Sequence, residues 1–123
     1  MATRSAIIMK DGDTYKGIYC HWDGYPSGVG EILKHHYIDT GKVRELISLG
    51  DVSSLRENVH PSSGSNHSFN DPEDNVTVAY KRDRGEENTE AISGPTWRAV
   101  ANQIDHTYIY VFENGRWIIF LDY

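Results

Sequence analysis

Alternating apolar and polar positions near the C-terminus give the clearest structural signal of the chain. Over residues 106–123, HTYIYVF and RWIIFLDY flank Asn114-Gly115. Asn-Gly is the strongest short-range signal for a β-hairpin, because both of its residues tolerate the positive φ angles of a tight turn. A two-residue turn at this dipeptide pairs Glu113 with Arg116 as opposite charges, and it therefore sets the register of the whole hairpin.

That register gives the C-terminal hairpin two apolar faces. One face carries the cross-strand pairs Phe112–Trp117, Tyr110–Ile119 and Tyr108–Leu121, and the other carries Val111–Ile118 and Ile109–Phe120. A sheet with one face in water would instead alternate apolar and polar side chains. One face is expected to pack on helices. The other is expected to be covered by a further helix, by a long loop, or by a second copy of the chain, so a homodimer or higher homo-oligomer is expected.

A second hairpin and one single strand are predicted upstream. SAIIM and TYKGIYC, within residues 5–20, flank Asp11-Gly12, a dipeptide that favours a hairpin turn. The segment 75–81, NVTVAYK, alternates and is β-branched, which predicts a strand. Residues 56–75 are dominated by Ser, Asn, Asp, Gly and Pro, which predicts a long polar surface loop.

Helical spacing of apolar residues predicts two or three short helices. A first helix is expected over residues 28–37, and a second is expected between a cap at Asp39 or Thr40 and a stop at Gly50. A third and shorter helix, preceded by Ser93 or Thr96, is expected over 97–104. The chain is therefore predicted to be one α+β domain, residues 1–123. Its antiparallel sheet would have about five strands, two hairpins plus one strand, with the helices packed on it.

Composition narrows the function classes. The 123 residues suffice for one domain with its own core, and a single cysteine, Cys20, excludes an intrachain disulfide and fits a reducing compartment. The net charge of −6 argues against general binding to DNA, although an acidic surface suits a basic protein partner. No apolar run approaches the roughly 18 residues that span a bilayer, so a soluble cytoplasmic protein without membrane contact is expected.

Catalytic and metal-binding arrangements are not indicated. Cys20 and His21 are adjacent on a predicted strand, so their side chains point to opposite faces and cannot form a thiolate–imidazole pair. Candidate metal ligands are His21, Asp23, His35, His36, His60 and His67. None of them has a recognised metal-ligand spacing. The sequence therefore predicts no catalytic residue, no metal and no cofactor, and it favours a protein that is not an enzyme.

Two segments are candidates for ligand binding. His21, Trp22, Asp23 and Tyr25 crowd a strand-to-helix junction, where aromatic rings can stack on bases and polar groups can read their edges. The helix that begins near Gly28 would offer free N–H groups to an anion. The alternative is purely structural, a turn at Asp23 followed by a helix entry.

Arg82 and Arg84 form the second candidate segment. If they lie two residues apart at a strand end, both guanidinium groups point the same way, a geometry suited to a phosphate or carboxylate. The alternative is a solvated run of charges on a loop. Ligand capture requires this pair to meet the junction at residues 20–25 on one concave surface.

YCHWDGYPSGVGEIL, KVRELISLGDVSSL and AYKRDRGE occur in this order in the chain. In this respect the chain resembles a family of small proteins encoded by phages and prophages, most of them of unassigned function. The resemblance covers residues 4–57 and 76–87, with a looser match in the C-terminal hairpin. It implies a host bacterial cytoplasm and a viral accessory role.

Within that context, antagonism of bacterial immunity by stoichiometric binding is the leading hypothesis. The protein would sequester a nucleotide-derived immune signal, such as a cyclic oligonucleotide or an ADP-ribose derivative. In a first alternative, its acidic surface imitates nucleic acid and it inhibits a host defence protein directly, as anti-CRISPR proteins do. In a second alternative, it is a small hydrolase or nuclease that uses His21, Asp23 and Asp83.

Overall fold

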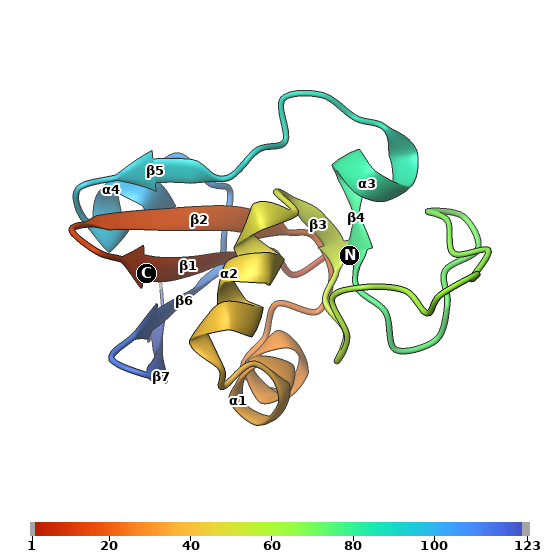
Figure 1. Cartoon of the computed structure of the whole chain (residues 1–123). Coiled ribbons are helices and arrows are strands. Elements are labelled where there is room, and N and C mark those ends of the chain that lie inside the picture. Colours follow the sequence, from red (N-terminus) through yellow and green to blue (C-terminus); the bar gives the residue numbers. More distant parts are fainter. Residues whose placement is uncertain (1, 122–123) are drawn as a thin grey trace.

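A seven-stranded mixed β-sheet forms the centre of the protein (Figure 1), in a computed structural model that describes residues 2–121. The strand order is β4-β3-β2-β1-β6-β7, and β5 pairs with β2 beside β3 along the same edge. The strands are β1 (Ser5–Asp11), β2 (Thr14–Cys20), β3 (Val52–Ser54), β4 (Val78–Ala79), β5 (Ile92–Gly94), β6 (Tyr108–Glu113) and β7 (Arg116–Leu121).

Short helices lie on both faces of the sheet. They are a π-helical turn η1 (Pro26–Gly30) and the α-helices α1 (Glu31–His36), α2 (Thr40–Ser48), α3 (Tyr80–Arg84) and α4 (Trp97–Ala101). One core cluster joins α1 and α2 to Ile7, Ile18 and Tyr110 of the sheet, and the other joins α4 to Ile8 and Val111. No helix in the described range 2–121 is long and apolar enough to cross a membrane.

The prediction of a five-stranded antiparallel sheet is wrong. Strand β1 pairs with β6 in parallel, Ser5 opposite Tyr108 through Met9 opposite Phe112, and β2 pairs with β3 in parallel at Cys20 and Val52. The reason is the path of the chain after α4. Thr107 donates its backbone N–H to the Arg4 carbonyl at 2.9 Å, so β6 starts at the same end of the sheet as β1 and runs in the same direction.

Both predicted hairpins form, although the turn of the first lies at Gly12-Asp13 and not at the expected Asp11-Gly12, because Asp11 pairs with Thr14. Asn114 and Gly115 have φ angles of 55° and 76°, and the cross-strand pairs run from Glu113–Arg116 to Tyr108–Leu121 in the expected register. The expected ion pair across the turn is replaced, because Glu113 accepts a hydrogen bond of 2.8 Å from the Tyr15 hydroxyl on β2. Arg116 therefore starts β7 without the carboxylate that the register had assigned to it.

The helix caps agree with the sequence prediction better than the helix lengths do. Asp39 caps α2 by accepting the Lys42 N–H at 3.0 Å, and Thr96 caps α4 by accepting the Ala99 N–H at 3.0 Å. The helix expected over 28–37 divides into η1 and α1. The strand expected over 75–81 is shortened to β4, because the chain turns into α3 at Tyr80. Residues 56–75 contain no helix or strand, as expected for a loop.

Gly17 on β2 allows α4 to lie close against the sheet. A Cβ atom at this position would stand 2.7 Å from Val100 Cγ1 and 2.8 Å from Ile8 Cγ1. We therefore expect Gly17→Ala to lower the free energy of unfolding by about 1–3 kcal/mol, the usual cost of an overpacked core. Urea denaturation measures this loss. Lys10→Ala, on the exposed end of β1, is the matched control, and an equal loss in both variants would contradict the close contact.

Candidate functional site

The junction after β2 is held by backbone hydrogen bonds to β3. His21 donates its N–H to the Val52 carbonyl at 3.1 Å, and Trp22 donates its N–H to the Ser53 carbonyl at 3.0 Å. The two strands therefore continue side by side beyond the end of β2. Because Cys20 faces the core below α2, His21 faces the opposite side of the sheet.

The side chains of this junction form an exposed aromatic corner, made of His21, Trp22, Asp23 and Tyr25. Trp22 is 44% exposed and Tyr25 is 39% exposed. The His21 ring meets the Trp22 ring edge-on at 4.7 Å between centroids, and the Tyr25 hydroxyl donates to Asp23 Oδ1 at 3.0 Å. The four predicted residues are thus brought together, with the Trp22 side chain partly exposed to solvent.

The expected anion site at the following helix is already occupied by the protein itself. Gly28 and Gly30 donate their N–H groups to the Tyr25 carbonyl, and Val29 donates to the Asp23 carbonyl. A Cβ at position 28 would stand 2.4 Å from the Asp23 carbonyl oxygen, so the glycine is required by this close turn. These N–H groups form hydrogen bonds within the corner itself, so they are not available to a ligand.

Arg82 lies in an internal network, and 25% of its side chain is exposed. Its Nη1 donates to the Val59 carbonyl at 2.6 Å, and its Nη2 donates to the Thr77 carbonyl at 2.6 Å. Its Nε donates to Asp83 Oδ1 at 2.9 Å. Arg82 therefore fastens the long loop to α3 and is not placed to bind a ligand together with Arg84, so the guanidinium pair that was expected to meet residues 20–25 on one concave surface does not form.

Asp83 is the centre of this network. Its side chain is 5% exposed, and its Oδ2 accepts the Ala79 N–H at 2.8 Å and lies 3.1 Å from Nε2 of His67, which is 2% exposed. Burial alone raises the pKa of Asp83, but the hydrogen bonds from Arg82 and Ala79 and the contact with His67 outweigh it and lower the pKa. His67 Nδ1 in turn accepts the Glu73 N–H at 2.9 Å, so the network anchors the loop 56–75.

Arg84 remains at the surface, above aromatic rings. Its guanidinium carbon lies 4.2 Å from the centroid of Phe69 and 5.3 Å from that of Tyr80, and the group also pairs with Glu86. Because α3 is a helix, residues 82 and 84 point in roughly opposite directions, whereas on the strand end expected from the sequence they would have pointed the same way.

The corner and Arg84 are connected across β3. Burial raises the pKa of Tyr80, and a polar contact with the Ser53 side chain partly offsets the rise. Ser53 follows Val52 on the strand that holds His21 and Trp22. Tyr19 lies on the same face, where its hydroxyl lies 2.6 Å from His21 Nδ1 and accepts Arg4 Nε at 3.0 Å.

We call this set the aromatic surface. It consists of Arg4, Tyr19, His21, Trp22, Tyr80 and Arg84. Three of its members were missed at the sequence level, Arg4, Tyr19 and Tyr80. Tyr19 could have been found from its position two residues before His21 on the same strand face. Arg4 and Tyr80 come close only through long-range pairing.

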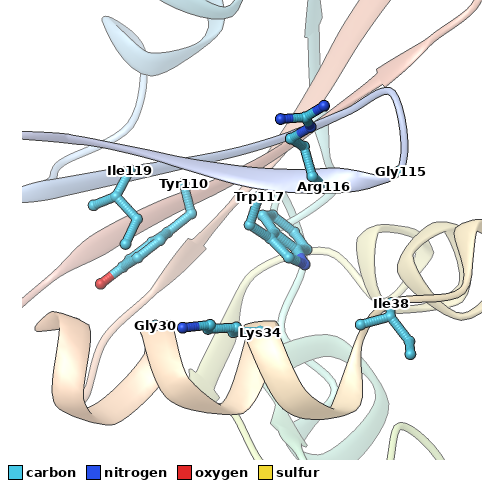
Figure 2. A pocket seen from close by; sticks show the side chains of 8 residues that line it. All are labelled: Gly30, Lys34, Ile38, Tyr110, Gly115, Arg116, Trp117 and Ile119. Atoms are coloured by element: carbon cyan, nitrogen blue, oxygen red, sulfur yellow. The ribbon is translucent and has the colours of Figure 1, made fainter.

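Three pockets lie elsewhere on the surface, and none of them is lined by the six predicted residues. The most apolar one, of about 290 Å³, lies between α1 and β7 (Figure 2). Its lining residues are Gly30, Lys34, Ile38, Tyr110, Gly115, Arg116, Trp117 and Ile119. Figure 2 shows Tyr110, Trp117 and Ile119 pointing from the strands toward the helix, while the Arg116 guanidinium points away.

Chemistry at the remaining candidate residues is restricted by burial. Cys20 is fully buried, and burial raises the pKa of its thiol to about 12. Among the described residues, no group of three His, Cys, Asp or Glu side chains is arranged to hold a metal ion. The three residues of the hydrolase hypothesis are also separated, because Asp83 is enclosed by the loop network while His21 and Asp23 lie on the corner.

Comparison with protein-family models finds no match for this chain, and comparisons with curated proteins and with solved structures find none either. The site is therefore interpreted from its own geometry.

The two arginines are expected to respond differently to truncation. Arg82→Ala removes the guanidinium that pairs with Asp83 and the donors to two carbonyl groups, so we expect a loss of about 3 kcal/mol in the free energy of unfolding. Arg84→Ala removes a surface pair and should cost no more than about 1 kcal/mol. Chemical denaturation of both variants measures the difference, and equal losses would contradict the internal role of Arg82.

The lowered pKa of Asp83 predicts a loss of stability in acid. The carboxylate contributes stability above its unfolded pKa of about 3.9, and this contribution disappears as pH falls through the lower folded pKa. Asp83→Asn should therefore be less stable than the native chain at pH 7, and the difference should shrink below about pH 4. Thermal unfolding across this range tests the direction. A difference independent of pH would contradict it.

Proposed function

We propose that this protein is a phage-encoded antagonist of bacterial immunity that acts in the host cytoplasm by binding, without turnover, a nucleotide-derived immune signal. The observation that supports the proposal is the aromatic surface. The exposed Trp22 ring contacts the His21 imidazole after β2, and Arg84 lies over Tyr80, which is in polar contact with Ser53 on the neighbouring strand β3. An aromatic ring beside a cation is a common arrangement for holding a base and its phosphate.

Each group has a distinct part in the proposed complex. The Trp22 ring supplies a stacking face for a base, with Tyr25 beside it at the corner. Arg84 and Arg4 supply charge for phosphates from the two ends of the surface. His21 and Tyr19, already hydrogen-bonded to each other, supply a donor and an acceptor for ribose hydroxyls or base edges.

Binding without turnover is favoured because the groups available for covalent chemistry are buried, paired or weakly nucleophilic. The thiol of Cys20 is buried below α2, and the carboxylate of the corner, Asp23, is held by the Tyr25 hydroxyl. A nucleophile with its base in hydrogen-bond contact is the minimum requirement for covalent catalysis. The Tyr19 hydroxyl and His21 Nδ1 are in such contact, but burial raises the pKa of this phenol and disfavours the phenolate that would attack.

A second candidate is direct inhibition of a host defence protein. It is favoured by the exposure of Trp22 and Tyr25 at the corner, since exposed Trp and Tyr side chains are typical of protein-binding hot spots. The net charge of −6 suits a partner that normally binds nucleic acid.

Calorimetry with ADP-ribose, a cyclic dinucleotide and a cyclic trinucleotide tests the proposal. We expect one of these probes to bind, and Trp22→Ala or Arg84→Ala to weaken the binding about tenfold or more, in line with the loss of one stacking or charge contact. Arg98→Ala is the matched control, because Arg98 also covers an aromatic ring, Trp97, but on α4.

The fate of the bound probe separates the candidate functions. A sequestering protein releases the probe intact on heating, and a hydrolase releases fragments, as chromatography of the supernatant would show. Absence of binding to all three probes, together with recovery of a defence nuclease that requires Trp22, would replace sequestration by direct inhibition.

A further inference from the structure

Strand β7 forms one whole edge of the sheet and is unusually exposed for an apolar strand. Six residues long, it pairs only with β6. Ile118 is 40% exposed on one face, and Ile119 is 47% exposed on the other. The opposite edge is made of β4 and β5, which have two and three residues. Long apolar edges promote pairing with another strand, and proteins usually blunt them with proline, charges or bulges.

The free edge presents a regular row of backbone donors and acceptors. In the two-residue turn, Glu113 and Arg116 form the hydrogen-bonded pair, so Arg116, Ile118 and Phe120 direct their backbone groups toward β6. Trp117 and Ile119 therefore direct their N–H and C=O groups outward. No bulge interrupts the β6–β7 register, so an added strand would meet a regular ladder.

The groove between α1 and β7 opens beside this edge (Figure 2). On the helical side, Gly30 at the end of η1, Lys34 on α1 and Ile38 just after α1 line the groove, and Ile38 is 68% exposed. On the strand, Trp117 and Ile119 form the opposite wall. A strand added to β7 would place alternate side chains over this groove, which one copy of the chain leaves open.

Charge favours a second copy on this face in particular. The chain has 18 acidic and 12 basic residues, yet among the described residues no carboxylate lines the groove. Within residues 2–121, neither Lys34 nor Arg116 has an ion-pair partner. Two copies of an acidic protein can therefore approach here with less carboxylate repulsion than at an average surface.

We propose that β7 pairs with β7 of a second copy, antiparallel about a two-fold axis at Ile118. This register overlaps residues 116–120 of both copies and sets Ile118 against Ile118 on one face. On the other face, Trp117 of each copy lies opposite Ile119 of the other and covers the groove.

The same register gives the guanidinium of Arg116 a partner in the second copy. Arg116 of each copy lies opposite the Phe120 ring of the other, a favourable contact between a guanidinium and an aromatic face. The two Arg116 side chains are then about 14 Å apart along the strands, whereas parallel pairing in register would bring them within about 5 Å. Antiparallel pairing therefore avoids the like-charge contact.

Sedimentation equilibrium between about 1 and 100 μM tests the dimer. We expect a dimer for the native chain, at least tenfold weaker association for Ile118→Lys, and unchanged association for the conservative control Ile118→Val. Circular dichroism verifies that each variant is folded. A monomer throughout the range would overturn the proposal, as would a dimer that Ile118→Lys leaves intact.

Cross-linking tests the register even if the lysine variant does not fold. Cα atoms of two Ile118 residues in a non-hydrogen-bonded pair are about 4.5 Å apart, within disulfide range, whereas those of two Ile119 residues are about 8 Å apart. Under mild oxidation we expect Ile118→Cys to form a disulfide-linked dimer and Ile119→Cys to remain uncrosslinked. The native Cys20 is buried and does not contribute background. The reverse result, or no cross-link in either variant, would exclude this pairing.

Discussion

The parallel pairing of β1 with β6 is the interaction on which the rest of the structure depends. It joins the N-terminal hairpin to the C-terminal hairpin over five residue pairs, and it places β1 between two neighbours. The residues of β1 from Ser5 to Met9 are buried on both faces, so helices have to cover both sides of the sheet. Without this pairing the chain would have two isolated hairpins, and isolated hairpins are marginally stable in water.

Local features of the fold were predictable because they depend on neighbouring residues. The Asn114-Gly115 turn fixes the register of its hairpin, and Asp39 and Thr96 cap their helices, all through contacts within a few residues. The parallel pairs were not predictable, because no local sequence pattern determines at which end of the sheet β6 begins after α4. The α3 helix was missed for a similar reason: NVTVAYK alternates like a strand, but the buried Asp83 accepts the Ala79 N–H and ends it.

In the candidate site, too, the residues that are close in sequence were predictable and those that meet through long-range contacts were not. His21, Trp22, Asp23 and Tyr25 are close in sequence and remain close in space. Arg82 was misread because the sequence shows a charge and not its surroundings: two backbone carbonyls and Asp83 take up its donors. Arg4 and Tyr80 joined the aromatic surface only through strand pairing. The surface is thus partly visible in the sequence: of its two cations, Arg84 was predicted and Arg4 was not.

Tyr110 connects two regions that have been described separately. Its ring lines the groove between α1 and β7, and its hydroxyl donates to the Gly24 carbonyl at 2.6 Å, between Asp23 and Tyr25 of the corner. Its side chain is fully buried, so it has little freedom to move independently of either region. A second copy in the groove and a ligand at the corner, as proposed above, would therefore both act on one rigid phenol. Any influence of one on the other must be reciprocal, equal in free energy in both directions, as thermodynamic linkage requires.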